Sequence, residues 1–337
     1  MKIKLYRSIL LLLVVFNLSS CGFKQNSDKE SFLYVRTGAG LEELTDSLQG
    51  KLTDVNSFKK YAESKDLISK IKPGKYKIEV GETNHSLLDK LIDGKQEEVK
   101  LMIKNEPTIF HLAKSVSKHI EADSASIVEA IIGWANAQND STLNAETVKR
   151  FFIPNTYNYW WATSGEEFVE KMNKEFNKVW TEERARKAQD LNMSQLEVFT
   201  LASIVQLEAS KVDEQPKVAR AYLNRLAKDM RLEADPTSIY AYRMQNGFDK
   251  KIQRVYHGHL AVPSDYNTYR VKGLPPAPIC LPNMTAVDAV LNPDTHDFVY
   301  FCADPDRPGY HSFTNSFKEH TENAAKYRKW LNDNNIK

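Results

Sequence analysis

The chain has 337 residues, of which 42% are hydrophobic, so it can bury a substantial core and has room for roughly two domains. Its 46 lysines and arginines nearly balance 44 aspartates and glutamates, which leaves a formal net charge of +2. This small charge gives no field of one sign, so we expect no nucleic-acid partner. Three cysteines are too few for a disulfide-held scaffold, and whether Cys280 pairs with Cys302 stays open at this point.

The amino terminus has the three parts of an export signal. Basic residues precede a short apolar run over residues 9–16, and the sequence LSSC ends at Cys21. The run is shorter than the roughly 20 apolar residues that span a bilayer. LSSC resembles the lipobox of bacterial lipoproteins, in which the cysteine carries the lipid. We therefore predict a lipoprotein-type signal peptide over 1–21, acylation of Cys21 and a polar tether over 22–31. The alternative is an ordinary cleaved signal with an incidental cysteine.

The next segment, up to residue 104, mixes helical and strand periodicities and predicts a small α+β unit. Asn84 can cap a helix that Gly94 ends. We expect two further helices, at 41–48 and 55–62, and strands at 32–36, 74–80 and 99–103.

The middle of the chain is largely helical in pattern. Helical periodicity runs over 107–120 and 124–137, which we expect to cover the junction between domains, and a polar segment over 166–191 predicts one long helix. Between them, FFIPNTYNYWW at 151–161 concentrates six aromatic residues. Such a cluster can form a wall on which sugar rings stack, or it can be packed in a core, and both readings stay open.

The stretch that begins at Ser194 carries the strongest chemical signal. Ser194 and Glu197 form a capping box that opens a helix with an apolar stripe. Glu208 lies on the last turn of that stripe, where a solvated charge is unusual. A carboxyl group on an apolar wall has a raised pKa and can donate a proton near neutral pH, which suits a general acid. Alternatively, the helix ends near Glu208 and its side chain reaches solvent or pairs with Arg220 or Arg225.

The segments downstream contain more candidate residues. Asp235 can cap a helix whose first residue is Pro236, and Glu233 lies in the linker just before it. Residues 266–282 are too rich in proline and glycine for regular structure. We expect a long ordered loop there, which commonly forms the edge of a binding site.

Three consecutive segments, LASIVQLEAS, VARAYLNRL and MRLEADPTSIYAY, resemble in this order the YceG-like endolytic murein transglycosylase family. The resemblance continues through YNTYRVKGLPPAPICLPN and GYHSFTNSFKEH, and it extends more loosely from Phe32 to the carboxyl terminus. It implies an α+β fold, with a small LysM-like module over 32–104 and a mixed α+β catalytic domain over 105–337. Whether the module holds glycan or is a structural platform stays open.

The resemblance places the catalytic glutamate of the family at Glu208. Three positions depart from the family pattern: Gln206 replaces an acidic residue, Glu233 replaces a glutamine, and Asn155 replaces an aspartate, so we assign no acid role to position 155. The matching segments also imply a set of substrate contacts, which are Asn224, Arg225, Glu233, Asp235, Asn267, Thr268, Tyr269 and His311.

The implied reaction is cleavage of the β-1,4 bond between N-acetylmuramic acid and N-acetylglucosamine within peptidoglycan strands. Glu208 would protonate the leaving oxygen and then take the proton of the muramoyl C6 hydroxyl as a 1,6-anhydro ring closes. One carboxyl group then suffices, whereas water-using glycosidases normally need a second one. Two alternatives stay open: a muramidase-type hydrolase in which Glu233 or Asp235 is the second carboxyl, and a non-catalytic peptidoglycan-binding lipoprotein.

Expected partners and location follow from the resemblance and the export signal. Peptidoglycan strands are the expected substrate, no cofactor is implied, and the isolated pair His257 and His259 gives no expectation of a metal. The lipid on Cys21 would hold the protein at a cell membrane, facing the periplasm. A peptidoglycan synthase is a further partner that the sequence leaves open.

Overall fold

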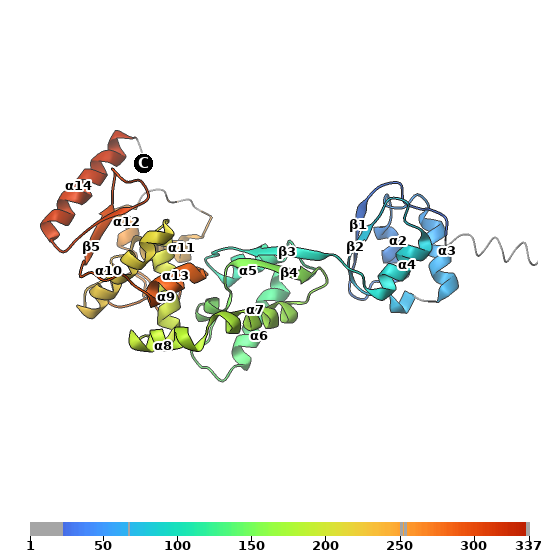
Figure 1. The fold of residues 1–337 in the computed structure, drawn as a ribbon, viewed down its shortest axis with the longest axis horizontal. Coiled ribbons are helices and arrows are strands. Elements are labelled where there is room, and N and C mark those ends of the chain that lie inside the picture. Colours follow the sequence, from blue (N-terminus) through green and yellow to red (C-terminus); the bar gives the residue numbers. More distant parts are fainter. Residues whose placement is uncertain (1–22, 67, 250–251, 253–254, 335–337) are drawn as a thin grey trace, which may run out of the picture. The chain divides into compact units, whose positions relative to one another are not determined.

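The computed structural model describes residues 23–66, 68–249, 252 and 255–334 (Figure 1). These residues divide into two compact units. Helices and short two-stranded sheets alternate along the described chain, which confirms the α+β class. Unit 1 contains the described residues up to Leu101 together with 116–123 and 157–164. Unit 2 contains 102–115, 124–156 and the described residues from Gly165 onward.

Unit 1 is built on a pair of antiparallel strands with helices packed around a shared apolar core. The strands pair from Ser31 opposite Ile78 to Val35 opposite Gly74. Buried residues alternate along both strands, at Leu33 and Val35 on β1 and at Gly74, Tyr76 and Ile78 on β2, as expected for a sheet with one face on a core. Its elements are β1 (Ser31–Val35), α2 (Leu41–Ser47), α3 (Val55–Lys65), the 3₁₀ turn η1 (Ile68–Lys70), β2 (Gly74–Ile78) and α4 (Asn84–Asp93).

The ends of α4 follow the sequence signals, with one correction. Gly94 ends the helix in the left-handed conformation, as predicted, with φ of 74°. The predicted cap at Asn84 is wrong, because Thr83 caps the helix by accepting the Ser86 N–H at 3.1 Å. Asn84 is buried instead and donates to the Ser57 hydroxyl at 2.8 Å, so its side chain is used in packing rather than at the helix end.

Part of the segment predicted as a tether, 22–31, is packed against unit 1. Asn26 and Ser27 are both buried. The Asn26 side chain donates to the Asp54 carbonyl and to Asn84 Oδ1, each at 2.7 Å. Polar side chains are stable inside a protein when their hydrogen bonds are made, so a polar composition did not make this stretch a free tether.

The predicted signal peptide over 1–21, with its lipidation site Cys21, lies outside the described residues. Among the helices that the structure describes, none combines the length and the apolar character that a membrane crossing requires. The anchor therefore stays a prediction from the sequence.

The elements from residue 98 onward are mainly helical. β3 pairs with β4, and β5 pairs with β6 in an antiparallel hairpin. The elements are β3 (Glu98–Ile103), α5 (Ile109–Val116), α6 (Ser124–Ala137), η2 (Thr147–Phe151), β4 (Asn155–Trp160), α7 (Gly165–Val179), α8 (Glu182–Asp190), α9 (Gln195–Glu208), η3 (Val212–Glu214), α10 (Gln215–Ala227), α11 (Asp235–Asn246), α12 (His257–Leu260), α13 (Met284–Leu291), β5 (Tyr300–Ala303), β6 (His311–Thr314) and α14 (Phe317–Asp333).

The aromatic segment over 151–161 was interpreted either as core or as a surface on which sugar rings stack, and its residues divide between buried and exposed positions. Phe152, Tyr157 and Tyr159 are buried, as the core reading expects. Trp160 keeps 48% of its surface exposed, so the segment also leaves aromatic surface accessible.

The single long helix predicted over 166–191 is wrong, because the chain breaks between α7 and α8. Thr181 caps α8 by accepting the Arg184 N–H, and a capped start cannot be the interior of a longer helix. The break turns α8 toward α13, where Arg184 Nε and Nη2 donate to the two carboxylate oxygens of Asp288 at 2.7 and 2.9 Å.

Helix α9 is the central element of unit 2 (Figure 1). It opens with the predicted capping box of Ser194 and Glu197. The prediction of one apolar stripe understates its burial, since every residue from Val198 to Val205 is buried. The helix packs against α8, α10, α11 and α13, which together cover all sides of its buried stretch. Glu208, its last residue, is therefore carried on a rigid support.

Candidate active site

Glu208 ends α9 with its carboxyl group enclosed by unit 2. The residue as a whole is half-buried, yet its Oε2 atom is inaccessible to solvent and has no hydrogen-bond partner among the described residues. Tyr222 of α10 hydrogen-bonds to the carboxyl group. The arginine pairing considered above is not observed: Arg220 donates to the Asp294 carbonyl at 2.6 Å, and Arg225 pairs elsewhere.

The environment of Glu208 sets its proton affinity near neutrality. Burial raises the pKa of Glu208 to about 7, and the negative charge of Asp235 acts in the same direction. The charge of His311 and the hydrogen bond of Tyr222 oppose the rise because they stabilise the ionised form. A carboxyl group in this balance is available both to give and to take a proton near pH 7.

Asp235 faces the same carboxyl group from the start of α11. The prediction that it caps this helix is wrong: Asp235 is the first helical residue, after Ala234, and no side-chain capping bond is made. Its Oδ1 atom accepts the Tyr269 hydroxyl at 2.6 Å instead. Burial raises the pKa of Asp235, and the bond from Tyr269 partly offsets that rise. Asp235 and Tyr269 therefore form one side of the site.

His311, the first residue of β6, is fixed by Glu214 of η3. Glu214 Oε1 accepts the backbone N–H of His311 at 2.8 Å, and Oε2 lies 2.8 Å from the ring Nδ1. A carboxylate at Nδ1 requires a proton on that nitrogen. Glu214 is buried, so the ring is held in one orientation beside Glu208, whose pKa it lowers. The sequence did not identify Glu214 or Tyr222 as site residues, because nothing in their spacing distinguishes them from other acidic and aromatic residues of the chain.

Asn224 and Arg225, predicted to contact substrate, hold backbone beside the site. Asn224 Nδ2 donates to the His296 carbonyl at 2.9 Å. Arg225 is buried, and its guanidinium donates to the Val299 carbonyl at 2.6 Å and to Glu233 Oε2 at 3.0 Å. These bonds fix the chain that leads into β5. Glu233 itself is exposed, with φ of 52°, and points its carboxylate at this arginine.

The loop over 266–282 is irregular, as predicted, but two of its three predicted contacts are inside the protein. Asn267 and Thr268 have no exposed surface. Thr268 Oγ1 lies 2.8 Å from Thr237 Oγ1 and fixes the start of α11. Tyr269 is the predicted loop contact that the structure brings to the site.

Gln206, the first departure from the family pattern, has a structural role two residues before Glu208. Its Oε1 atom accepts the Asn283 N–H at 2.6 Å, and its Nε2 atom donates to the Leu281 carbonyl at 3.4 Å. An ionised glutamate could not make the second bond because it has no donor. The amide therefore fastens the loop to α9 next to the candidate acid.

The two cysteines that the sequence left open are both free thiols, Cys280 buried and Cys302 half-buried. The His257 and His259 pair lies on the short helix α12, where His259 Nδ1 accepts the Tyr256 N–H at 3.1 Å. Within the described part of the chain, no three histidine, cysteine or acidic side chains group together in a way that could hold a metal ion.

Similar proteins extend over nearly the whole chain. A model of the YceG-like family matches residues 33–326. A Bacillus subtilis (strain 168) protein named endolytic murein transglycosylase is 36% identical over 166 residues, which are 49% of this chain and 43% of the relative. A protein of the same name from Streptococcus pneumoniae serotype 2 is 24% identical over 333 residues, covering 90% of this chain and 59% of the relative. The chain thus spans about half the length of these curated relatives.

A solved structure has the same fold. The crystal structure of a YceG-like protein from Listeria monocytogenes superposes with a TM-score of 0.58 at 23% sequence identity. The match covers 88% of this chain and 99% of the Listeria chain. The arrangement of elements described above is therefore shared with that protein.

Proposed function

The chain belongs to the YceG-like family, and we propose that it is an endolytic murein transglycosylase. Its substrate is the β-1,4 bond between N-acetylmuramic acid and N-acetylglucosamine within peptidoglycan strands, and its product carries a 1,6-anhydro end. The observation that carries the proposal is the enclosed carboxyl group of Glu208, whose pKa burial raises to about 7. The names of the Bacillus and Streptococcus relatives support the same activity.

The proposed reaction uses one carboxyl group twice. Protonated Glu208 gives its proton to the glycosidic oxygen as the bond from that oxygen to the anomeric carbon breaks. The resulting carboxylate is stabilised by His311 and Tyr222, the two groups that lower its pKa. It then takes the proton of the muramoyl C6 hydroxyl while that oxygen bonds to the anomeric carbon. Glu208 ends protonated, as it began, and no water enters.

The products test this proposal. Sacculi digested in heavy-oxygen water should yield muramoyl ends that are one water lighter than reducing ends and carry no solvent oxygen, as mass spectrometry can show. Fragments should span several disaccharides, because the cuts lie within strands. Asp235 beside Glu208 is the observation that favours a muramidase-type hydrolase as the competitor. Reducing ends labelled with solvent oxygen would establish that competitor. Binding to sacculi without any soluble fragment would indicate a non-catalytic binding protein.

The activity should fall as the pH rises through the Glu208 pKa. With a pKa of about 7, the protonated fraction of Glu208 drops tenfold for each pH unit well above that value. Below pH 6, Glu208 is almost fully protonated, so its titration should leave the initial rate of fragment release nearly constant. Above pH 8, it should fall by about tenfold per unit. A rate that stays constant from pH 6 to pH 9 would contradict the role of Glu208 as the acid.

For the membrane anchor, we propose acylation of Cys21, which would hold the enzyme at a cell membrane with the catalytic domain facing the periplasm. The lipobox-like LSSC supports this. Cys21→Ala removes the thiol, so it should abolish palmitate labelling and leave the precursor unprocessed, as gel mobility and metabolic labelling can show. Unchanged labelling and a processed, membrane-bound Cys21→Ala protein would refute the anchor.

The domain assignment is also a proposal. We propose that residues 32–104 form a LysM-like module and 105–337 the catalytic domain. The antiparallel strand pair of unit 1, with α2 and α3 between its strands, supports a small separate module.

A further inference from the structure

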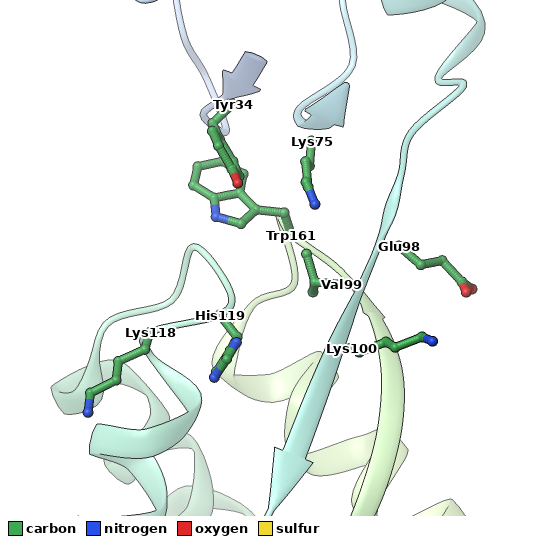
Figure 2. A pocket seen from close by; sticks show the side chains of 8 residues that line it. All are labelled: Tyr34, Lys75, Glu98, Val99, Lys100, Lys118, His119 and Trp161. Carbon is green, nitrogen blue, oxygen red and sulfur yellow. The ribbon is translucent and has the colours of Figure 1, made fainter. Parts of the chain in front are cut away.

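A groove of about 670 Å³ opens in unit 1, and none of the residues that line it is assigned to the reaction (Figure 2). Its walls come from separate parts of the chain: β1, β2, β3, the turn after α5 and the turn after β4. The side chains that give it its chemistry are two aromatic and four basic residues, Tyr34, Trp161, Lys75, Lys100, Lys118 and His119.

The aromatic side of the groove is a packed pair. Tyr34 and Trp161 meet with ring centroids 5.1 Å apart and an interplanar angle of 62°. Tyr34 keeps 43% of its surface exposed, and Trp161 is half-buried. Figure 2 shows the Tyr34 ring lying against the indole at the head of the groove. Accessible aromatic surface of this kind packs well against the apolar face of a pyranose ring.

The other lining residues are mainly basic, together with Val99 and Glu98. Lys75, Lys100 and Lys118 provide three ammonium groups, against the single carboxylate of Glu98. Figure 2 shows Lys75 reaching from β2 toward Trp161. The Lys75 Nζ atom lies 4.2 Å from the centroid of the Phe32 ring, a cation–π contact that positions it. The groove therefore suits a ligand that has both a sugar face and negative charge.

Hydrogen bonds hold the walls of the groove together. The Glu121 carboxylate accepts the Thr37 N–H at 2.9 Å and the Thr37 hydroxyl at 2.7 Å, while the Glu121 N–H donates to the Trp161 carbonyl at 2.6 Å. The Thr163 hydroxyl donates to the Trp160 carbonyl at 2.7 Å and fixes the turn that carries Trp161. A site whose walls are already ordered loses less conformational entropy when a ligand binds.

We propose that this groove is a second peptidoglycan-binding site, selective for strands that carry their stem peptides. The tryptophan face takes a sugar of the strand, and the lysines take stem-peptide carboxylates, since the sugars of such a strand are uncharged. The identity of the ligand rests on the proposed function. The aromatic surface favours a glycan over an anionic membrane surface, for which the lysines alone would suffice.

Binding can be measured separately from cleavage in the protein with Glu208→Gln. The probes are purified glycan strands with intact stem peptides and an uncharged β-1,4-linked oligomer of N-acetylglucosamine, because strands stripped by an amidase would keep a lactyl carboxylate on each muramic acid. At physiological salt, Lys75→Gln should weaken binding of stem-bearing strands by about fivefold, with no effect on the uncharged oligomer. Trp161→Ala should weaken binding of both by about tenfold. Lys60→Gln, an exposed lysine on α3 with the same charge change, should alter neither.

The results separate this proposal from its rivals. Unchanged binding of both probes by Lys75→Gln overturns it, and this variant keeps the test decisive if Trp161→Ala does not fold. If Lys75→Gln loses binding to phosphatidylglycerol vesicles while its binding to strands is unchanged, the groove is a membrane contact and the proposal is also overturned. Product analysis of the protein with native Glu208 is independent of these outcomes. Groove-dependent binding without 1,6-anhydro products would leave the groove standing and remove only the proposed reaction.

Discussion

Replacing Glu208 with glutamine should reduce the release of soluble fragments from sacculi by about 10³-fold. The amide preserves the shape of the side chain but has no proton of suitable acidity to give and cannot become a carboxylate. A dye-release or mass-spectrometric digestion assay measures the loss. As a matched control, Glu170→Gln, an exposed carboxyl on α7, should digest sacculi at the normal rate.

Thermal melting shows whether the loss is chemical. Because the folded state raises the pKa of Glu208 from its usual 4.5 to about 7, it binds a proton that the unfolded state releases in this range. The free energy of unfolding of the native protein therefore falls as the pH rises from 4.5 to 7. Glutamine does not titrate, so the variant should gain stability relative to the native protein as the pH rises from 4.5 to 7. Normal digestion by a folded Glu208→Gln protein would exclude Glu208 as the catalytic acid.

Lys149→Met should destabilise the protein by about 3 kcal/mol, by removing one partner of a buried ion pair. The Lys149 side chain has no exposed surface. Its Nζ atom donates to Glu146 Oε2 at 2.7 Å, to the Tyr240 hydroxyl at 2.9 Å and to the Pro107 carbonyl at 3.3 Å. Methionine fills the space, but it leaves the Glu146 carboxylate, which is 29% exposed, without its cation. The loss is expected near the lower end of the range for buried pairs.

Urea denaturation measures this loss of stability. Two further variants test whether it comes from the buried ion pair. Lys174→Met, which breaks the exposed pair with Glu170, should change stability by less than about 1 kcal/mol. Adding Glu146→Gln to Lys149→Met should recover part of the loss, because the stranded charge is then gone. A Lys149→Met protein that unfolds at the native urea concentration would mean that the pair contributes nothing.

Local signals predicted elements well where short-range chemistry decides the structure. Helix α6 has the predicted bounds of 124–137, and Ser194 and Glu197 open α9 as expected. One failure arose where a residue distant in sequence competes for a side chain. Asp235 does not cap α11 because Tyr269, distant in sequence, donates to its carboxylate. No pattern within a short window can report that competition.

Of the candidate site, the sequence predicted the central residue better than the residues that surround it. Spacing and family resemblance together pointed to Glu208, but the cause of its raised pKa is an enclosure assembled from distant segments. Asn267 and Thr268 were predicted as contacts because they lie in the matching loop, but both are buried. Asn267 donates to the Leu260 and Val262 carbonyls, and Thr268 fixes the start of α11. Polar residues in such a loop look alike in sequence, whether they face a ligand or the interior.

The central position of α9 determines which parts of the site can rearrange when a strand enters. Freeing this helix would expose the core of unit 2, so its opening costs nearly as much as global unfolding. Any rearrangement that accommodates a glycan strand therefore falls on segments other than α9, while the proposed proton donor keeps its position and needs no reorganisation before the next cut.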